Sequence, residues 1–198
     1  MSTKSLLVIL FISFAVIANA QINDEFIETF SNLSNWNSLN NGGSWSLQNH
    51  ALYVNGFGTY PTDNFIKLET HSFLTPSTKS FTLEFRWIIL SIRDQSALWL
   101  RDDNGNNLID ISDYSGRIGF YTTGGISYCN RIELNRWYNI RVKIYPNSNT
   151  ADYYVDGVLT RSNLTFESGQ RDYSNRVRIV LGSRGGDSFM ISHIKIKL

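Results

Sequence analysis

Paired carboxylates on one strand face would be the clearest sign of glycoside hydrolysis, because two such groups must flank the scissile bond. Even spacing along a strand places two side chains on the same face. The glutamates of the chain are Glu25, Glu28, Glu69, Glu84, Glu133 and Glu167. None of them has a second carboxylate two or four positions away within a credible strand, and Glu84 lies alone between Thr82 and Arg86. The sequence therefore predicts no catalytic pair of this kind.

Metal chemistry is not predicted either. His50, His71 and His193 lie in separate segments without metal-ligand spacing. Asp102–Asp113 approaches the spacing of a calcium loop, but Asn107 occupies the position that requires Gly, so we expect a hairpin turn there. We expect no cofactor, and calcium at another oxygen-rich loop stays an open alternative. A lyase base assembled from His and Tyr on different strands also stays open.

Aromatic residues, at 14% of the chain, are the feature that most favours a binding site. Trp and Tyr rings pack on the faces of sugars, and polar side chains bond their hydroxyl groups. Polar or aromatic side chains on the outward faces of the expected strands are our candidate ligand-binding residues: Glu84, Arg86, Trp99, Tyr121, Arg141, Tyr154 and Arg178. On a concave sheet they would line a groove. On a flat sheet, a ladder of Arg and Glu would only solubilise an outer face.

The element that must position such residues is centred on residues 136–145, where apolar and polar side chains alternate with the period of a half-buried strand. Pro146–Asn149 turns the chain, and Tyr153–Val155 returns it. Asp156-Gly157 then forms a second tight turn. We expect three consecutive antiparallel strands inside a larger sheet.

The mature chain as a whole is predicted to be all-β. No helical period persists for three turns, and turn clusters recur about every ten residues. Ala97–Arg101 and Leu108–Ser112 form a further expected hairpin. We predict a single-domain antiparallel β-sandwich of jelly-roll type, spanning residues 21–198.

Residues 1–20 are expected to be a cleaved signal peptide. Lys4 precedes an apolar run, Leu6–Ile17, and Ala18–Ala20 has the small residues of a cleavage site. The run is too short to span a bilayer, although an uncleaved anchor is the alternative. We therefore expect a secreted, extracellular protein without membrane insertion.

Charge excludes one class of partner. The chain has 18 basic and 17 acidic residues, so loss of Lys4 leaves 17 of each. A neutral mature protein has no electrostatic footprint for nucleic acid or an anionic membrane.

Secretion bears on the single cysteine and on two glycosylation sequences. Cys129 is the only cysteine, so no intramolecular disulfide can form, and we expect it to be buried as a small apolar residue. Asn32-Leu33-Ser34 and Asn163-Leu164-Thr165 are acceptor sequences for N-glycosylation.

Several motifs carry a resemblance to a known superfamily. They are Trp36, Gly43, Trp45 and Leu52, then Trp137-Tyr138 with Tyr154–Gly157, and finally Gly182–Gly186 leading into Phe189. These resemble concanavalin A-like lectin/glucanase domains, including laminin-G-like and pentraxin-like members. The resemblance implies a jelly roll whose closing strand returns beside the first. Ser192 and His193 stand where many relatives carry acidic residues, which argues against a family metal site there.

Such folds host lectins, hydrolases, lyases and adhesion modules, so the resemblance specifies function only weakly. We expect a lectin-like domain that recognises glycans or extracellular glycoproteins by binding rather than by catalysis. A structural or protein-interaction module is the first alternative, and a polysaccharide lyase or hydrolase is the second. The sequence does not specify the ligand or the oligomeric state.

Overall fold

The computed structural model describes residues 25–40, 43–56, 66–75, 79–169 and 176–198. The expected signal peptide, residues 1–20, lies outside this part of the chain. The described residues form a two-layered antiparallel β-sandwich, which confirms the predicted fold class. One helical element, the 3₁₀ turn η1 (Pro146–Ser148), occurs in the described ranges. None of the described segments forms a helix long and apolar enough to cross a membrane.

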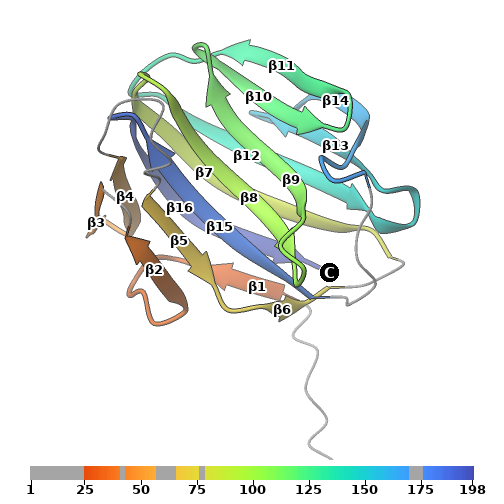
Figure 1. Cartoon of the computed structure of the whole chain (residues 1–198), viewed down its shortest axis with the longest axis horizontal. Coiled ribbons are helices and arrows are strands. Elements are labelled where there is room, and N and C mark those ends of the chain that lie inside the picture. The colour runs from red at the N-terminus through yellow and green to blue at the C-terminus, as the bar shows by residue number, and fades with distance from the viewer. Residues whose placement is uncertain (1–24, 41–42, 57–65, 76–78, 170–175) are drawn as a thin grey trace, which may run out of the picture.

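The two sheets lie face to face, with the strands of one in front of the other in Figure 1. Sheet A has the order β14 (Val158–Thr165), β13 (Thr150–Val155), β12 (Trp137–Tyr145), β7 (Phe81–Ser91), β16 (Ser188–Lys197), β4 (Ala51–Gly56) and β3 (Gly43–Gln48), and β1 (Glu25–Glu28) also pairs with β16. Sheet B has the order β11 (Gly125–Arg131), β10 (Arg117–Thr122), β9 (Asn107–Tyr114), β8 (Gln95–Asp102), β15 (Arg176–Arg184), β5 (Ile66–Thr70) and β2 (Trp36–Asn40), and β6 (Phe73–Leu74) also pairs with β15.

The expected meander is present as β12, β13 and β14, paired antiparallel in that order. Its core-facing side chains are Tyr138, Ile140, Val142 and Ile144, each at most 1% exposed. These residues pack against the inner face of sheet B. Phe120 of sheet B stacks on Tyr153 of sheet A, for example, with ring centroids 4.1 Å apart. The alternating pattern therefore assigned the buried face of β12 correctly.

Two other expectations from the sequence are confirmed. β8 and β9 form the expected hairpin, and the Asp102 carboxylate accepts hydrogen bonds from the backbone and side-chain nitrogens of Asn106, at 2.8 and 2.9 Å. The first described strand, β1, pairs with the last, β16, as the resemblance implied. Cys129 differs from expectation, because it is half-buried at the edge of the core.

Two connections between the sheets, from β7 to β8 and from β15 to β16, lie together at one end of these central strands. Asp187 ties these crossings together, since its carboxylate accepts hydrogen bonds from the backbone nitrogens of Arg93 and Asp94. Burial raises the pKa of Asp187. Gly185 has φ 67°, and a Cβ there would lie 2.2 Å from that of Asp94. The close approach of the two crossings therefore requires glycine.

Candidate functional site

The seven candidate binding residues divide between the two outer faces of the sandwich. Glu84, Arg86, Arg141 and Tyr154 lie on the outer face of sheet A, whereas Trp99, Tyr121 and Arg178 lie on that of sheet B. The apolar core separates the two groups. The seven residues therefore do not line one groove, because residues that share an outward orientation belong to different sheets.

The outer face of sheet B carries a row of side chains on neighbouring strands. Strand register places Glu69 opposite Val180, Val180 opposite Trp99, and Trp99 opposite Asp110. Trp99 is only 5% exposed, yet it clusters with Ala97 and Val180 rather than with the main core. A tryptophan outside the core, surrounded by polar groups, needs an explanation other than core packing. We name Glu69, Trp99, Arg101, Asp110, Tyr121 and Arg178 the Trp99 strip.

A chain of hydrogen bonds fixes the indole of Trp99. Its Nε1 donates to Oδ2 of Asp110 at 2.7 Å, and the Ser112 hydroxyl donates to Oδ1 of the same carboxylate at 2.6 Å. Gln95 Nε2 in turn donates to Ser112 Oγ at 3.0 Å. All four side chains are buried. A connected network of this kind holds its members in one arrangement.

The Asp110 carboxyl group has an unusually high pKa. Burial raises the pKa of Asp110 from 3.8 to about 7, and the nearby Glu167 carboxylate adds to the increase. Hydrogen bonds from Ser112 and Trp99 and the charge of Arg101 act in the opposite direction. Strongly shifted carboxyl groups occur preferentially at functional sites.

Charged groups surround the fixed indole. Arg178 Nε lies 3.9 Å from Oε2 of Glu69. Arg101 donates from Nε to Oδ1 of Asn107 at 2.6 Å, and its guanidinium carbon lies 5.2 Å from the centroid of the Trp99 ring. Burial, and then the Arg178 cation, lower the pKa of Arg101. The strip thus presents donors from two arginines and an acceptor from Glu69 around a buried indole that Arg101 partly covers. Such an arrangement can bond several hydroxyl groups at once.

Sequence reasoning missed the polar part of this strip. Asp110 and Ser112 alternate with Ile109 and Ile111, and this pattern could have identified a polar outer face on β9. Glu167 follows β14 in the chain, and its proximity to Asp110 arises only from the tertiary fold. No local spacing encodes that contact.

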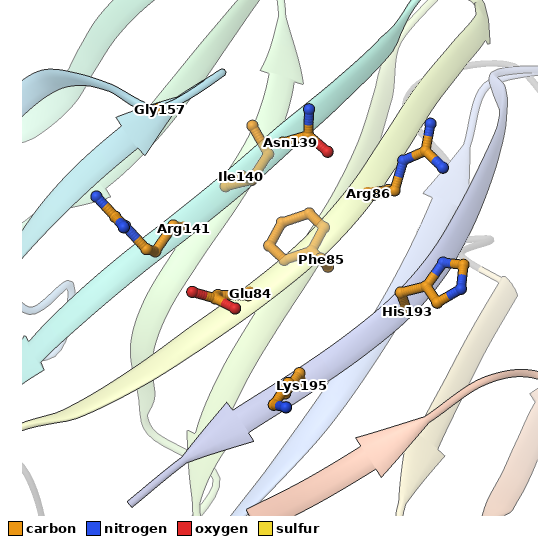
Figure 2. A pocket seen from close by; sticks show the side chains of 9 residues that line it. All are labelled: Glu84, Phe85, Arg86, Asn139, Ile140, Arg141, Gly157, His193 and Lys195. Carbon is orange, nitrogen blue, oxygen red and sulfur yellow. The ribbon is translucent and has the colours of Figure 1, made fainter.

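The outer face of sheet A contains two adjoining hollows. The first, of about 350 Å³, is shown in Figure 2 and is lined by Glu84, Phe85, Arg86, Asn139, Ile140, Arg141, Gly157, His193 and Lys195. The second, of about 370 Å³, is lined by Gln48, Asn49, His50, Ala51, Arg86, Ile88, Trp137, Met190, Ser192 and His193. Arg86 and His193 line both hollows, which we therefore describe together as the furrow.

Strand register explains how the furrow is built. Arg141, Glu84 and Lys195 lie opposite one another on β12, β7 and β16. Figure 2 accordingly shows Glu84 between Arg141 and Lys195. Two residues away along β12 and β7, Asn139 lies opposite Arg86.

The backbone adopts left-handed conformations at two places along the furrow. His193 has φ 55°, at the irregularity that interrupts the pairing of β16 with β7. Asn49 and His50, in the turn between β3 and β4, have φ 50° and 60°. Left-handed conformations are uncommon outside glycine, and an irregular ladder changes the direction of a side chain. His193 therefore faces the furrow instead of continuing the strand alternation.

Within the described ranges, no group of three or more His, Cys, Asp or Glu side chains is arranged to hold a metal ion. Asn32 and Asn163 are both exposed, and their glycosylation stays a prediction.

Comparison with known proteins gives fold relatives but no family. No family model and no curated protein sequence matches the chain. A sialidase structure matches with a TM-score of 0.67 and 16% identity, over 82% of this chain but 17% of the sialidase. The structure of "Crh5 transglycosylase in complex with NAG" matches with a TM-score of 0.65 and 12% identity, over 89% of this chain and 84% of that one. The carbohydrate-binding module CBM66 from Bacillus subtilis matches with a TM-score of 0.55 and 14% identity, over 84% and 98% of the two chains.

These identities show the fold alone. The chain spans under a fifth of the sialidase, since it covers 17% of that protein, and nearly the whole length of the other two. The shared architecture is an antiparallel β-sandwich of two sheets.

Proposed function

We propose that this domain binds glycans through the Trp99 strip on the outer face of sheet B. The observation that carries the proposal is the network in which Asp110 and Ser112 hold the indole of Trp99 outside the main core. Burying a carboxylate costs stability, and strongly shifted carboxyl groups occur preferentially at functional sites, which supports a binding role for this network.

The chemistry around the Trp99 indole suits a sugar. Glu69, Arg101, Tyr121 and Arg178 are all half-buried, so part of each residue is exposed on the sheet face that also carries the buried Trp99. Two of the structural neighbours support this class of ligand, because one is named a carbohydrate-binding module and another was solved with NAG. A shallow site of this kind binds weakly, with Kd values in the millimolar to micromolar range, roughly −4 to −8 kcal/mol.

Glycan cleavage is the second candidate function, and one observation favours it. A pKa of about 7 would leave Asp110 partly protonated near neutral pH, as a general acid requires, and the Glu167 carboxylate is close enough to influence it. However, Asp110 is 4% exposed and both of its oxygens accept hydrogen bonds from the protein. We therefore assign Asp110 a positioning role and favour binding.

A polysaccharide panel tests the proposal. The wild type, Tyr121→Ala and Arg178→Ala would be compared by affinity electrophoresis in neutral polysaccharides. Lys143→Ala is the control, because Lys143 is exposed on the opposite sheet. We expect Arg178→Ala to weaken binding about tenfold or more, since a hydrogen bond to a charged group contributes about 1.5 to 3 kcal/mol, and Tyr121→Ala to weaken it about two- to tenfold, since a neutral one contributes about 0.5 to 1.5 kcal/mol. Binding that is unchanged in both variants would contradict the proposed site. Sustained release of reducing ends or unsaturated uronates would favour the enzyme instead.

We also propose that the protein acts outside the cell, as the sequence at residues 1–20 suggests. An extracellular location would bring the strip into contact with cell-surface or matrix glycans.

A further inference from the structure

Two arginines in the furrow on sheet A carry charges that no ion pair within the described part of the chain neutralises. Glu84 forms an ion pair with Lys197, at 3.2 Å, and Lys195 forms one with Glu25. Among the described residues, neither Arg86 nor Arg141 has a carboxylate within ion-pair distance. Both arginines are exposed, and both line the first hollow.

Aromatic rings hold these two guanidinium groups in place. The guanidinium carbon of Arg86 lies 5.0 Å from the centroid of the Trp137 ring, and that of Arg141 lies 4.1 Å from the centroid of the Tyr154 ring. A guanidinium group over a ring face keeps its N–H donors directed outward from its edge. The stack also reduces the side-chain entropy that a ligand must remove on binding.

Both arginines line one hollow, so a single ligand with repeated anionic groups can contact them together. Arg86 lies opposite Asn139, and Arg141 is two residues from Asn139 along β12, so the two arginines are diagonal neighbours on adjacent strands. Diagonal neighbours lie about 7 to 8 Å apart, and their Cβ atoms are somewhat closer. The planar fork of arginine bonds a carboxylate with two parallel hydrogen bonds. Asn139, which lines the same hollow, adds an amide that can bond a hydroxyl group.

We propose that the furrow is a second binding site, which recognises an acidic polysaccharide through its uronate carboxylates, with Arg86 and Arg141 as the two anion-binding groups. The choice of a saccharide rests on the proposed function, whereas the choice of an anion rests on the furrow alone. The site lies on the face of the sandwich opposite the Trp99 strip. One domain would then contact neutral and acidic parts of a glycan on opposite sides.

The test uses Arg86→Gln, Arg141→Gln and the control Lys143→Gln. Lys143 is exposed on the same sheet face, lines neither hollow, and its substitution removes the same single charge. Isothermal titration would use polygalacturonate as the probe, at 50 and 300 mM NaCl. We expect each arginine variant to lose about tenfold or more in affinity and Lys143→Gln less than about twofold, with weaker binding of the wild type at high salt.

Three results would overturn the proposal. They are failure of the wild type to bind polygalacturonate, the same loss of affinity for it in all three variants, and binding of polyglutamate that is as tight as that of polygalacturonate and has the same dependence on Arg86. Equal Arg86-dependent binding of dextran sulfate would overturn the assignment of carboxylate as the recognised group. The strip variant Tyr121→Ala separates the two sites. It should leave polygalacturonate binding unchanged, and a loss of neutral-glycan binding in that variant concerns the proposed function only.

Discussion

Replacing Asp110 with Asn should make the protein more stable at neutral pH and leave it nearly unchanged in acid. The Asp110 carboxyl is 4% exposed, and its pKa rises from 3.8 to about 7 because of burial. The native state therefore holds this proton more tightly than the unfolded chain does. Between these two values the unfolded state loses its proton first, so the free energy of unfolding falls as pH rises. Above about pH 7 the loss is complete.

The magnitude follows from the shift. An increase in the pKa of Asp110 by about 3 corresponds to about 4 kcal/mol of unfolding free energy, at 1.36 kcal/mol for each pKa unit. This value is an upper limit for a buried group. The carboxamide of Asp110→Asn carries no charge, so it resembles the protonated acid. Its oxygen can accept from the Trp99 indole, and its nitrogen can donate to Ser112 Oγ.

The assay is urea unfolding followed by far-UV circular dichroism, at intervals from pH 4 to pH 8. The quantity of interest is the difference in unfolding free energy between Asp110→Asn and the wild type. Asp113 and Asp187, whose pKa values burial also raises, are present in both proteins and cancel in this difference. We expect the difference to rise by up to about 4 kcal/mol across the range. A difference that stays constant at every pH would refute the claim that burial raises the pKa of Asp110. A difference that falls as pH rises would mean that folding lowers this pKa.

Three further predictions concern the core, the N-terminus and glycosylation. Ile140→Ala should destabilise the protein by about 2 to 5 kcal/mol in denaturant melts, because Ile140 is buried. Arg141→Ala should cost less than about 1 kcal/mol, because Arg141 is exposed. Equal losses of stability in the two variants would contradict the assignment of the buried face. N-terminal mass spectrometry of protein from culture medium should show cleavage after Ala20, and retention of the apolar run would contradict it. Ser34→Ala and Thr165→Ala should each remove one glycan from protein secreted by eukaryotic cells, seen as increased gel mobility, without replacing either acceptor asparagine.

The strand alternation allowed much of the fold to be predicted. At β12 the apolar and polar residues alternate strictly, so the buried face followed from the sequence. The turn Asp156-Gly157 has φ 50° and 81°, as a tight hairpin requires. Both features are local, and local patterns are readable along the chain.

The division of the candidate residues between two sheets could not be predicted. Arg141 and Arg178 both alternate with buried apolar residues, but β12 and β15 pair with different neighbours and face opposite ways. Sheet membership depends on which distant strands pair, and a period of two carries no information about that. The electrostatic interaction of Glu167 with Asp110 has the same origin, because Glu167 follows a strand of sheet A whereas Asp110 lies on sheet B.

The most direct measurement of the central claim is a titration of the indole N–H resonances in a ¹H–¹⁵N spectrum. The chain has 5 tryptophans, and Trp99→Phe and Trp137→Phe would assign the two signals that report on the strip and the furrow. The Trp99 indole donates to Asp110, so a ligand on the strip must alter its environment. With the best-binding neutral oligosaccharide from the panel, the account predicts that the Trp99 signal shifts in a saturable way while that of Trp137 stays in place. A Trp99 signal that does not move at saturating ligand would contradict it.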